Sequence, residues 1–330
     1  MEKLVNTIER LGGVNLLPVA LAVVAFVLIG NPSSWVTLTV AGLAMGMMIF
    51  LMASGLSLVF GLMNVLNFGH SAFVSFGAFV AASVLAGLSG WLSGDSIMLG
   101  ALALFLAVSA ALLFGLIAGW FFETVIIRPV YEDHLRQILI TMGALIVSEQ
   151  IILAVWGGTP TAVPRPDFLE GALIIGDISI EIYRIFAFAL GLVVYIALYA
   201  VLNRTRIGLL IRAGVESREM VEALGFRIDR LFIGVFMLGS ALAAVGGAMW
   251  AGYETLISPA LGGEIMIIVF IVVIIGGLGS IEGTLLGAIM VGLVGNYVGF
   301  LAPKLALASN MLLMMAILMW RPSGLRPAVK

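Results

Sequence analysis

Apolar runs of about 17–25 residues, almost free of charge, recur along the chain, and a helix needs about this length to cross a bilayer. Hydrophobic residues make up 62% of the 330 positions and charged residues 10%. An ordinary soluble domain has about 45–50% and about 25% of these classes. The sequence therefore predicts an all-α integral membrane protein, with residues 1–330 forming a single transmembrane domain.

We expect about ten transmembrane helices, separated by turn signals such as Asn31-Pro32 and Ala302-Pro303. They cover residues 15–30, 36–62, 65–88, 97–122, 136–156, 182–202, 231–251, 265–280, 284–300 and 305–320. No charge fixes the side of the membrane at the turns 61–69 and 276–283. Each could be a full turn or a break inside the membrane, so we expect two broken or re-entrant segments.

The basic residues predict the orientation, because cytoplasmic loops carry an excess of Lys and Arg. With the N-terminus inside, 13 of the 16 basic residues fall on the cytoplasmic side. Only Arg165, Arg184 and Lys304 then lie outside, where the loop 157–181 is acidic. We therefore expect both the N- and C-termini to be cytoplasmic.

Residues 61–79, GLMNVLNFGHSAFVSFGAF, place several polar side chains between two apolar runs. Backbone that leaves the helix within a membrane must be buried in protein or face water. Broken helices near the midplane recurrently present polar groups to a solute. We expect a substrate pathway lined by Asn64, Asn67, His70, Ser71 and Ser75. The alternative is hydrogen bonding between helices, worth about 1 kcal/mol or less for each group.

The second break, at residues 276–284, repeats this pattern with Ser280 and Glu282. An ionisable residue at membrane depth indicates function by default, so both residues join the expected pathway. Glu282 could instead lie at the cytoplasmic interface. The pair Glu149-Gln150, near the outer end of its helix, is open to the same two interpretations.

Small residues recur every four positions in residues 239–252, which include Gly239, Gly247 and Gly252. Such ridges let membrane helices approach closely and gain van der Waals contact. The pairs Gly283/Gly287 and Gly295/Gly299 have the same spacing. We interpret all of them as packing surfaces.

The largest cytoplasmic segment, residues 203–230, contains a short amphipathic stretch at 217–224, which Gly225 is placed to end. A helix of two turns is too short to be stable alone and must pack on something. It could lie on its own bundle or at the lipid headgroups. It could equally be inserted into a groove of a cytosolic partner.

Several chemistries are excluded. No Lys follows a glycine-rich loop, so the chain has no site for ATP phosphates and is not expected to be an enzyme. The sequence has no Cys and only two His, which argues against a metal site, and it shows no cofactor or nucleic-acid signature. The Gly69-His70-Ser71 shape of a serine protease nucleophile would need His134 as its base, which falls in a charged cytoplasmic loop.

Four stretches resemble branched-chain amino acid permeases of the LivH type, which are subunits of ABC importers. The first is residues 61–79. The other three are RPVYEDHLRQILITMGALIVSEQIILAVWG, EALGFRIDRLFIGVFMLGSALAAVGGAMWAG and IIGGLGSIEGTLLGAIMVGL, and the terminal RPSGL follows the last of them. They occur in the family's order over roughly residues 36–326. The residues after His70, Ser71-Ala72-Phe73, are closer to the sister permease type.

The resemblance implies a multi-pass protein of the bacterial inner membrane with three kinds of partner. ATP-binding cassette subunits would dock on a coupling loop that includes Arg212, Arg218, Glu219, Glu222, Ala223 and Gly225. A second permease subunit, identical or different, would complete the pathway, and an extracytoplasmic binding protein would deliver substrate. The implied substrate is a branched-chain amino acid, with urea, short amides or another small solute as alternatives.

A self-sufficient channel or secondary transporter explains the hydropathy equally well. It does not explain the charged, helix-forming coupling loop. It would also favour a buried ion-coupling carboxylate, for which Glu149 and Glu282 are the candidates.

Overall fold

The computed structural model describes residues 13–65, 67–93, 96–131, 133–216, 218–223, 225 and 227–327. Ten long helices dominate them: α2 (Gly13–Ile29), α3 (Pro32–Met63), α4 (His70–Gly87), α6 (Ile97–Phe122), α7 (His134–Trp156), α8 (Ile182–Arg204), α11 (Ile228–Glu254), α12 (Leu261–Gly276), α13 (Ile281–Leu301) and α14 (Ala306–Trp320). Each helix expected from the sequence has a counterpart among them.

Seven of the described helices are long and apolar enough to cross a membrane, whereas α2, α12 and α14 are shorter apolar helices. The chain is therefore a mostly helical, multi-pass membrane protein. The number of complete crossings and the side of each terminus stay predictions, and residues 1–12 and 328–330 lie outside the described ranges.

Most helices start within a few residues of the position that the sequence indicates, and two of the differences concern the expected breaks. Helix α4 begins at His70 rather than residue 65, because Asn64 takes a left-handed conformation (φ 50°) that ends α3. Helix α12 begins at Leu261 and ends at Gly276. Gly277 and Gly279 have positive φ, so the chain reverses there and α13 starts directly after Ser280.

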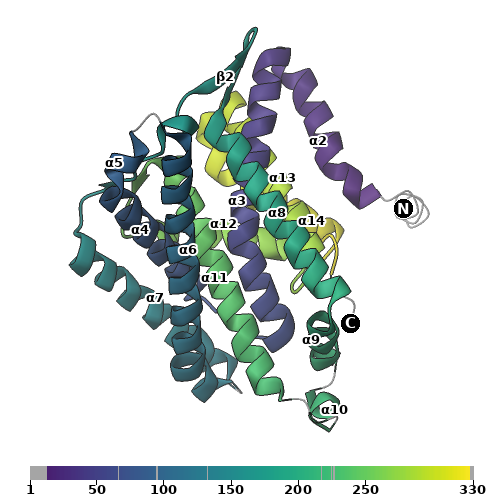
Figure 1. The fold of residues 1–330 in the computed structure, drawn as a ribbon. Helices are drawn as coiled ribbons and strands as arrows, with labels where there is room; N and C mark the ends of the chain where they lie inside the picture. The colour runs from purple at the N-terminus through teal and green to yellow at the C-terminus, as the bar shows by residue number, and fades with distance from the viewer. Residues whose placement is uncertain are drawn as a thin grey trace.

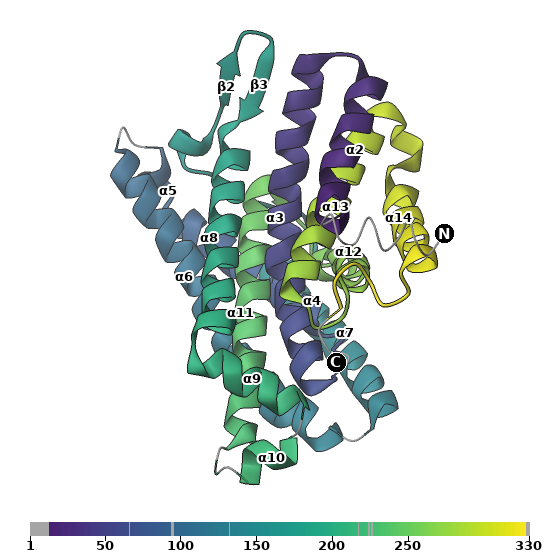
Figure 2. The ribbon, with the colours of Figure 1, turned by 90° about the vertical axis from the view of Figure 1, so that its right-hand side faces the viewer.

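Helices α3 and α11 lie side by side through the middle of the bundle (Figures 1 and 2). Most residues of both helices are buried, whereas few residues of α7 and α8 are. Helix α4 packs on α11, α6, α12 and α7. The exposed side chains of α7 and α8 are large and apolar, as expected of helices that face lipid.

The predicted small-residue ridge is confirmed where α11 crosses its neighbours. A Cβ built on Gly55 of α3 would lie 2.2 Å from the Gly239 carbonyl oxygen, and one on Gly247 would lie 2.0 Å from that of Val74. The pair Gly283/Gly287 also faces backbone of α12. A Cβ added at Gly295 or Gly299 would have no neighbour closer than 3.7 Å. The interpretation of that pair as a close packing surface was therefore wrong.

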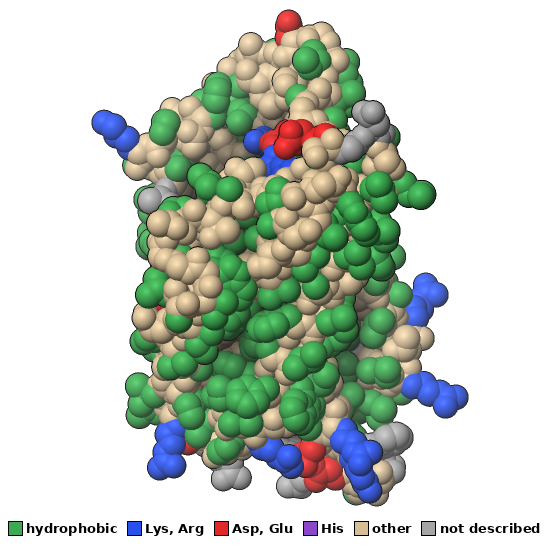
Figure 3. Space-filling model, turned by 60° about the vertical axis from the view of Figure 1, so that its left-hand side comes forward, with side chains coloured by type: hydrophobic (Ala, Val, Ile, Leu, Met, Phe, Trp, Pro, Cys, Tyr) green, Lys and Arg blue, Asp and Glu red, His purple; other side chains and the backbone are tan. Residues whose placement is uncertain are grey.

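Most charged side chains in Figure 3 lie near the two ends of the bundle, and apolar side chains cover much of the flank between them. One end carries the short helices α9 (Arg206–Glu216) and α10 (Arg218–Ala223). The other carries four short strands, which an all-α expectation does not include. Strand β2 (Ala172–Ile175) pairs with β3 (Ile178–Glu181), and β1 (Thr161–Ala162) pairs with β4 (Leu256–Ile257), both antiparallel.

Candidate functional site

The break between α3 and α4 places a short irregular segment inside the bundle. Asn64 caps α3, and its backbone N–H donates to the Phe60 carbonyl. The Asn64 side chain is exposed, whereas Asn67 has no exposed surface. Of the two asparagine side chains, therefore, only that of Asn67 lies in the protein interior.

Four of the predicted pathway residues lie together at the start of α4, and each is at most 1% exposed: Asn67, His70, Ser71 and Ser75. His70 Nε2 lies 2.9 Å from the Met52 carbonyl oxygen of α3. Its Nδ1, both amide atoms of Asn67 and both serine hydroxyls have no hydrogen-bond partner among the described residues.

Helix α7 adds polar groups that the sequence interpretation missed. The Phe68 N–H donates to Thr141 Oγ1 at 3.2 Å. One turn earlier, Gln137 donates to the carbonyls of Val130 and Tyr131, and its Oε1 has no partner within the described ranges. Gln137 and Thr141 are fully buried. Their i, i+4 spacing in an apolar helix was the signal that could have identified them.

We call this group the polar seam: Asn67, His70, Ser71, Ser75, Gln137 and Thr141. Most buried polar groups in folded proteins are hydrogen-bonded, and a buried group without a partner costs about 1–3 kcal/mol. Five of these six residues, all but Thr141, instead have a side-chain polar atom without a partner among the described residues. Such an arrangement can bind water or the polar part of a solute.

Glu123 is a further buried polar residue that the sequence interpretation missed. It is 2% exposed and begins η1, a π-helical turn (Glu123–Ile127) at the end of α6. The Tyr131 hydroxyl donates to its Oε1 at 3.4 Å, whereas its Oε2 has no partner in the part of the chain that the structure describes. Single π-helical turns occur frequently at functional sites.

The second predicted break is a tight turn that meets the first one. A Cβ on Gly61 of α3 would lie 2.6 Å from the Gly279 Cα. Ser280 caps α13 by accepting a hydrogen bond from the Gly283 N–H at 3.1 Å. Glu282 forms an ion pair with Arg326, and Arg326 also donates to Asn15. Ser280 and Glu282 thus hold the turn and the C-terminal segment together.

Residues 203–230, the expected coupling loop, lie at the end of the bundle opposite the β2–β3 hairpin (Figures 1 and 2). This segment contains two helices, α9 and α10, rather than the one expected, and Ile211 of α9 is buried. Glu222, Ala223 and Gly225 are exposed. Ser217 and Leu224 lie outside the described residues, as do the side chains of Arg212, Arg218 and Glu219.

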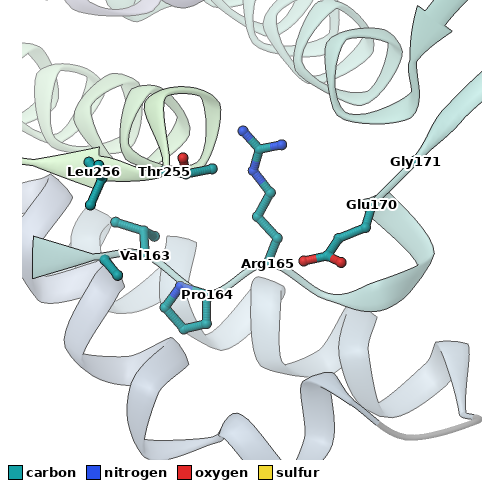
Figure 4. A pocket seen from close by; sticks show the side chains of 8 residues that line it. Val163, Pro164, Arg165, Glu170, Gly171, Thr255 and Leu256 are labelled. Atoms are coloured by element: carbon teal, nitrogen blue, oxygen red, sulfur yellow. The ribbon is translucent and has the colours of Figure 1, made fainter.

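At the other end of the bundle, Arg165 links the loop 157–181 to the end of α11. Its Nη1 pairs with Glu181 at 2.6 Å and its Nη2 donates to the Tyr253 carbonyl at 2.6 Å, while Nε donates to that of Gly252. A surface hollow of about 540 Å³ lies beside it, lined by Ala162, Val163, Pro164, Arg165, Glu170, Gly171, Thr255 and Leu256 (Figure 4).

A sequence profile for the branched-chain amino acid transport system / permease component matches residues 38–320. The chain belongs to this family. The permease is 28% identical to the high-affinity branched-chain amino acid transport system permease protein BraD of Pseudomonas aeruginosa, over 88% of this chain and 96% of BraD. It is 25% identical to LivH of Escherichia coli K12, over 88% of this chain and 95% of LivH.

A solved structure shares the fold of the permease. It is described as an inward-facing conformation of a metal-chelate type ABC transporter, with a TM-score of 0.51 and 17% sequence identity. The match covers 94% of this chain and 99% of that one. At this identity the likeness shows the fold alone, which is that of an ABC transporter membrane subunit.

Proposed function

We propose that this permease is the transmembrane subunit of an ABC importer that moves a small amino acid, first of all a branched-chain one, across the bacterial inner membrane. Family membership over residues 38–320 supports the transporter class. The names of BraD and LivH support the substrate class. Energy would come from separate ATP-binding subunits.

The partners would bind at opposite ends of the bundle. The ATP-binding subunits would dock on the loop 203–230, which carries α9 and α10. The extracytoplasmic binding protein would dock on the outer loops, including 157–181 and 252–264. A second permease subunit would pack beside this one and supply the rest of the pathway wall. Both termini would then be cytoplasmic, as the distribution of Lys and Arg predicts.

The polar seam is the observation that carries the proposal of a pathway. A solute with polar groups must exchange its water for other partners as it crosses. The seam offers Asn67, both serines and one nitrogen of His70 without partners among the described residues. Helix ends and broken segments at such a place are how many transporters bind polar solutes.

Replacement of Asn67 by alanine tests this pathway. Because neither amide atom has a partner within the described ranges, we expect the variant to unfold at the wild-type temperature. ATP-dependent uptake of radiolabelled leucine into proteoliposomes that hold the complete importer should fall about tenfold, the effect of one lost hydrogen bond to solute.

The matched control is Asn310→Ala, because Asn310 of α14 is also buried with an amide oxygen that lacks a partner in the described part of the chain. Its uptake should stay within about twofold of wild type. Wild-type uptake by Asn67→Ala would remove Asn67 from the pathway. No uptake by the wild-type complex would contradict the proposed function itself.

A further inference from the structure

Glu149 of α7 lies beside the start of α12. It follows Thr141 on α7 by eight residues, about two helical turns. Its Oε1 lies 3.2 Å from the position that a Cβ on Gly263 would occupy. Its carboxylate has no ion-pair or hydrogen-bond partner among the described residues. A carboxylate in a membrane helix without such a partner indicates function by default.

The start of α12 supplies the opposite partial charge. The first backbone N–H groups of a helix have no partner within it and give its N-terminus a positive partial charge. No side chain caps α12, and the Leu261 N–H donates to the Ser258 carbonyl. The next two residues of α12 have no side chain: Gly262 faces α4, and Gly263 faces Glu149 of α7.

A buried hydroxyl points at this helix end. Ser75 Oγ lies 2.6 Å from the position that a Cβ on Gly262 would occupy. Ser75 is 1% exposed, and its hydroxyl has no partner in the part of the chain that the structure describes. The hydroxyl therefore adds a donor and acceptor at the point where the α12 N–H groups emerge.

We infer that Glu149, Ser75 and the first turn of α12 form a subsite for the zwitterionic head of an α-amino acid. The ammonium group pairs with the Glu149 carboxylate. The solute carboxylate accepts hydrogen bonds from the α12 N–H groups and the Ser75 hydroxyl. This inference rests on the proposed function and adds to it the groups that select a zwitterion over a neutral amide.

Helices α12 and α4 pack closely at this point, because a Cβ on Gly262 would also lie 2.6 Å from the Ser71 carbonyl oxygen. The proposed subsite therefore requires α12 and α4 to separate when the solute carboxylate binds. The N-terminus of α12 would bind the carboxylate of the solute, and Glu149 would bind its ammonium group, so both charges of the solute would have a partner.

The test measures ATP-dependent leucine uptake by the complete importer in proteoliposomes, with Glu149→Gln, Ser75→Ala and the control Ser148→Ala. Ser148 precedes Glu149 on α7, and its hydroxyl donates to the Ala144 carbonyl of its own helix at 2.7 Å. We expect Glu149→Gln to lower uptake at least about tenfold, as loss of a charged hydrogen-bond partner does. Ser148→Ala should stay within about twofold of wild type.

Ser75→Ala separates a ligand role from a structural one. Removal of a buried hydroxyl without a partner does not weaken the fold, so its unfolding temperature should equal or exceed that of wild type while uptake falls at least about threefold. Leucine uptake by Glu149→Gln or Ser75→Ala within twofold of an active wild type would overturn the subsite and leave the proposed function standing. A wild-type complex that takes up no amino acid would overturn both.

Discussion

A single methyl group added at Gly247 should destabilise the permease by about 3 kcal/mol or more, because it would overpack a helix crossing. Its Cβ would lie 2.0 Å from the Val74 carbonyl oxygen and 2.9 Å from the Val74 Cα. Both atoms belong to the backbone of α4, which cannot rotate away as a side chain can. Helices α11 and α4 must therefore separate, and α4 carries Ser75 and the rest of its part of the seam with it.

The measurement is the thermal unfolding of purified Gly247→Ala in detergent, together with leucine uptake by its assembled complex. Gly234→Ala is the matched control, since Gly234 lies in the same helix and has nothing within 4 Å of an added Cβ. The control should change the free energy of unfolding by no more than about 0.5 kcal/mol. Equal stability of the two variants would contradict the tight crossing of α4 and α11.

Valine at Gly225 should uncouple the permease from its ATP-binding subunits without unfolding it. Gly225 has φ +86°, and nothing lies within 4 Å of an added Cβ. Backbone conformation rather than space therefore requires glycine there. A residue with a Cβ loses about 1–2 kcal/mol in a left-handed conformation, and a β-branched residue fits it worst. The backbone after α10 should therefore change conformation, and the position of the exposed Glu222 should change as well.

Gly225→Asn provides the control, because asparagine tolerates a left-handed backbone better than other residues with a Cβ. We expect Gly225→Val to lose at least about tenfold in co-purified ATPase and in uptake, and Gly225→Asn to keep most of both. Their unfolding temperatures should match that of wild type. Normal ATPase binding by Gly225→Val would remove this turn from the coupling surface.

Much of the fold could be predicted because membrane helices follow from length and hydropathy. The ten expected helices each have a counterpart, and both glycine-bracketed breaks occur near the expected residues. Their exact geometry could not be predicted. Asn64 adopts a left-handed conformation and α4 starts at His70, and both depend on what α3 and α4 pack against.

The candidate site could be predicted only where its polar residues are close in the chain. Asn67, His70, Ser71 and Ser75 lie within nine residues and were recognised together. Thr141 meets this segment from α7, where it accepts a hydrogen bond from the Phe68 N–H, and Gln137 lies one turn before it. Hydropathy reports how apolar a helix is, but not which of its faces meets another polar helix.

Glu282 shows the opposite limit. An acid inside an apolar region indicated a pathway residue, yet its carboxylate pairs with Arg326 near the end of the chain. The two residues are separated by 44 positions, and the sequence gives no sign of their contact. Ionisable residues within membrane segments commonly pair with one another, so the place of Glu282 in the pathway stays a prediction.

The central claim is that this permease moves solute only with a separate ATPase, and co-purification from native membranes tests it most directly. A tagged copy of the full chain should bring down a protein with a glycine-rich phosphate-binding loop, a binding protein and a second permease copy or homologue. The Gly225→Val variant should lose the ATPase from this set. A wild-type chain that is isolated alone, and moves leucine in liposomes without ATP, would contradict the claim.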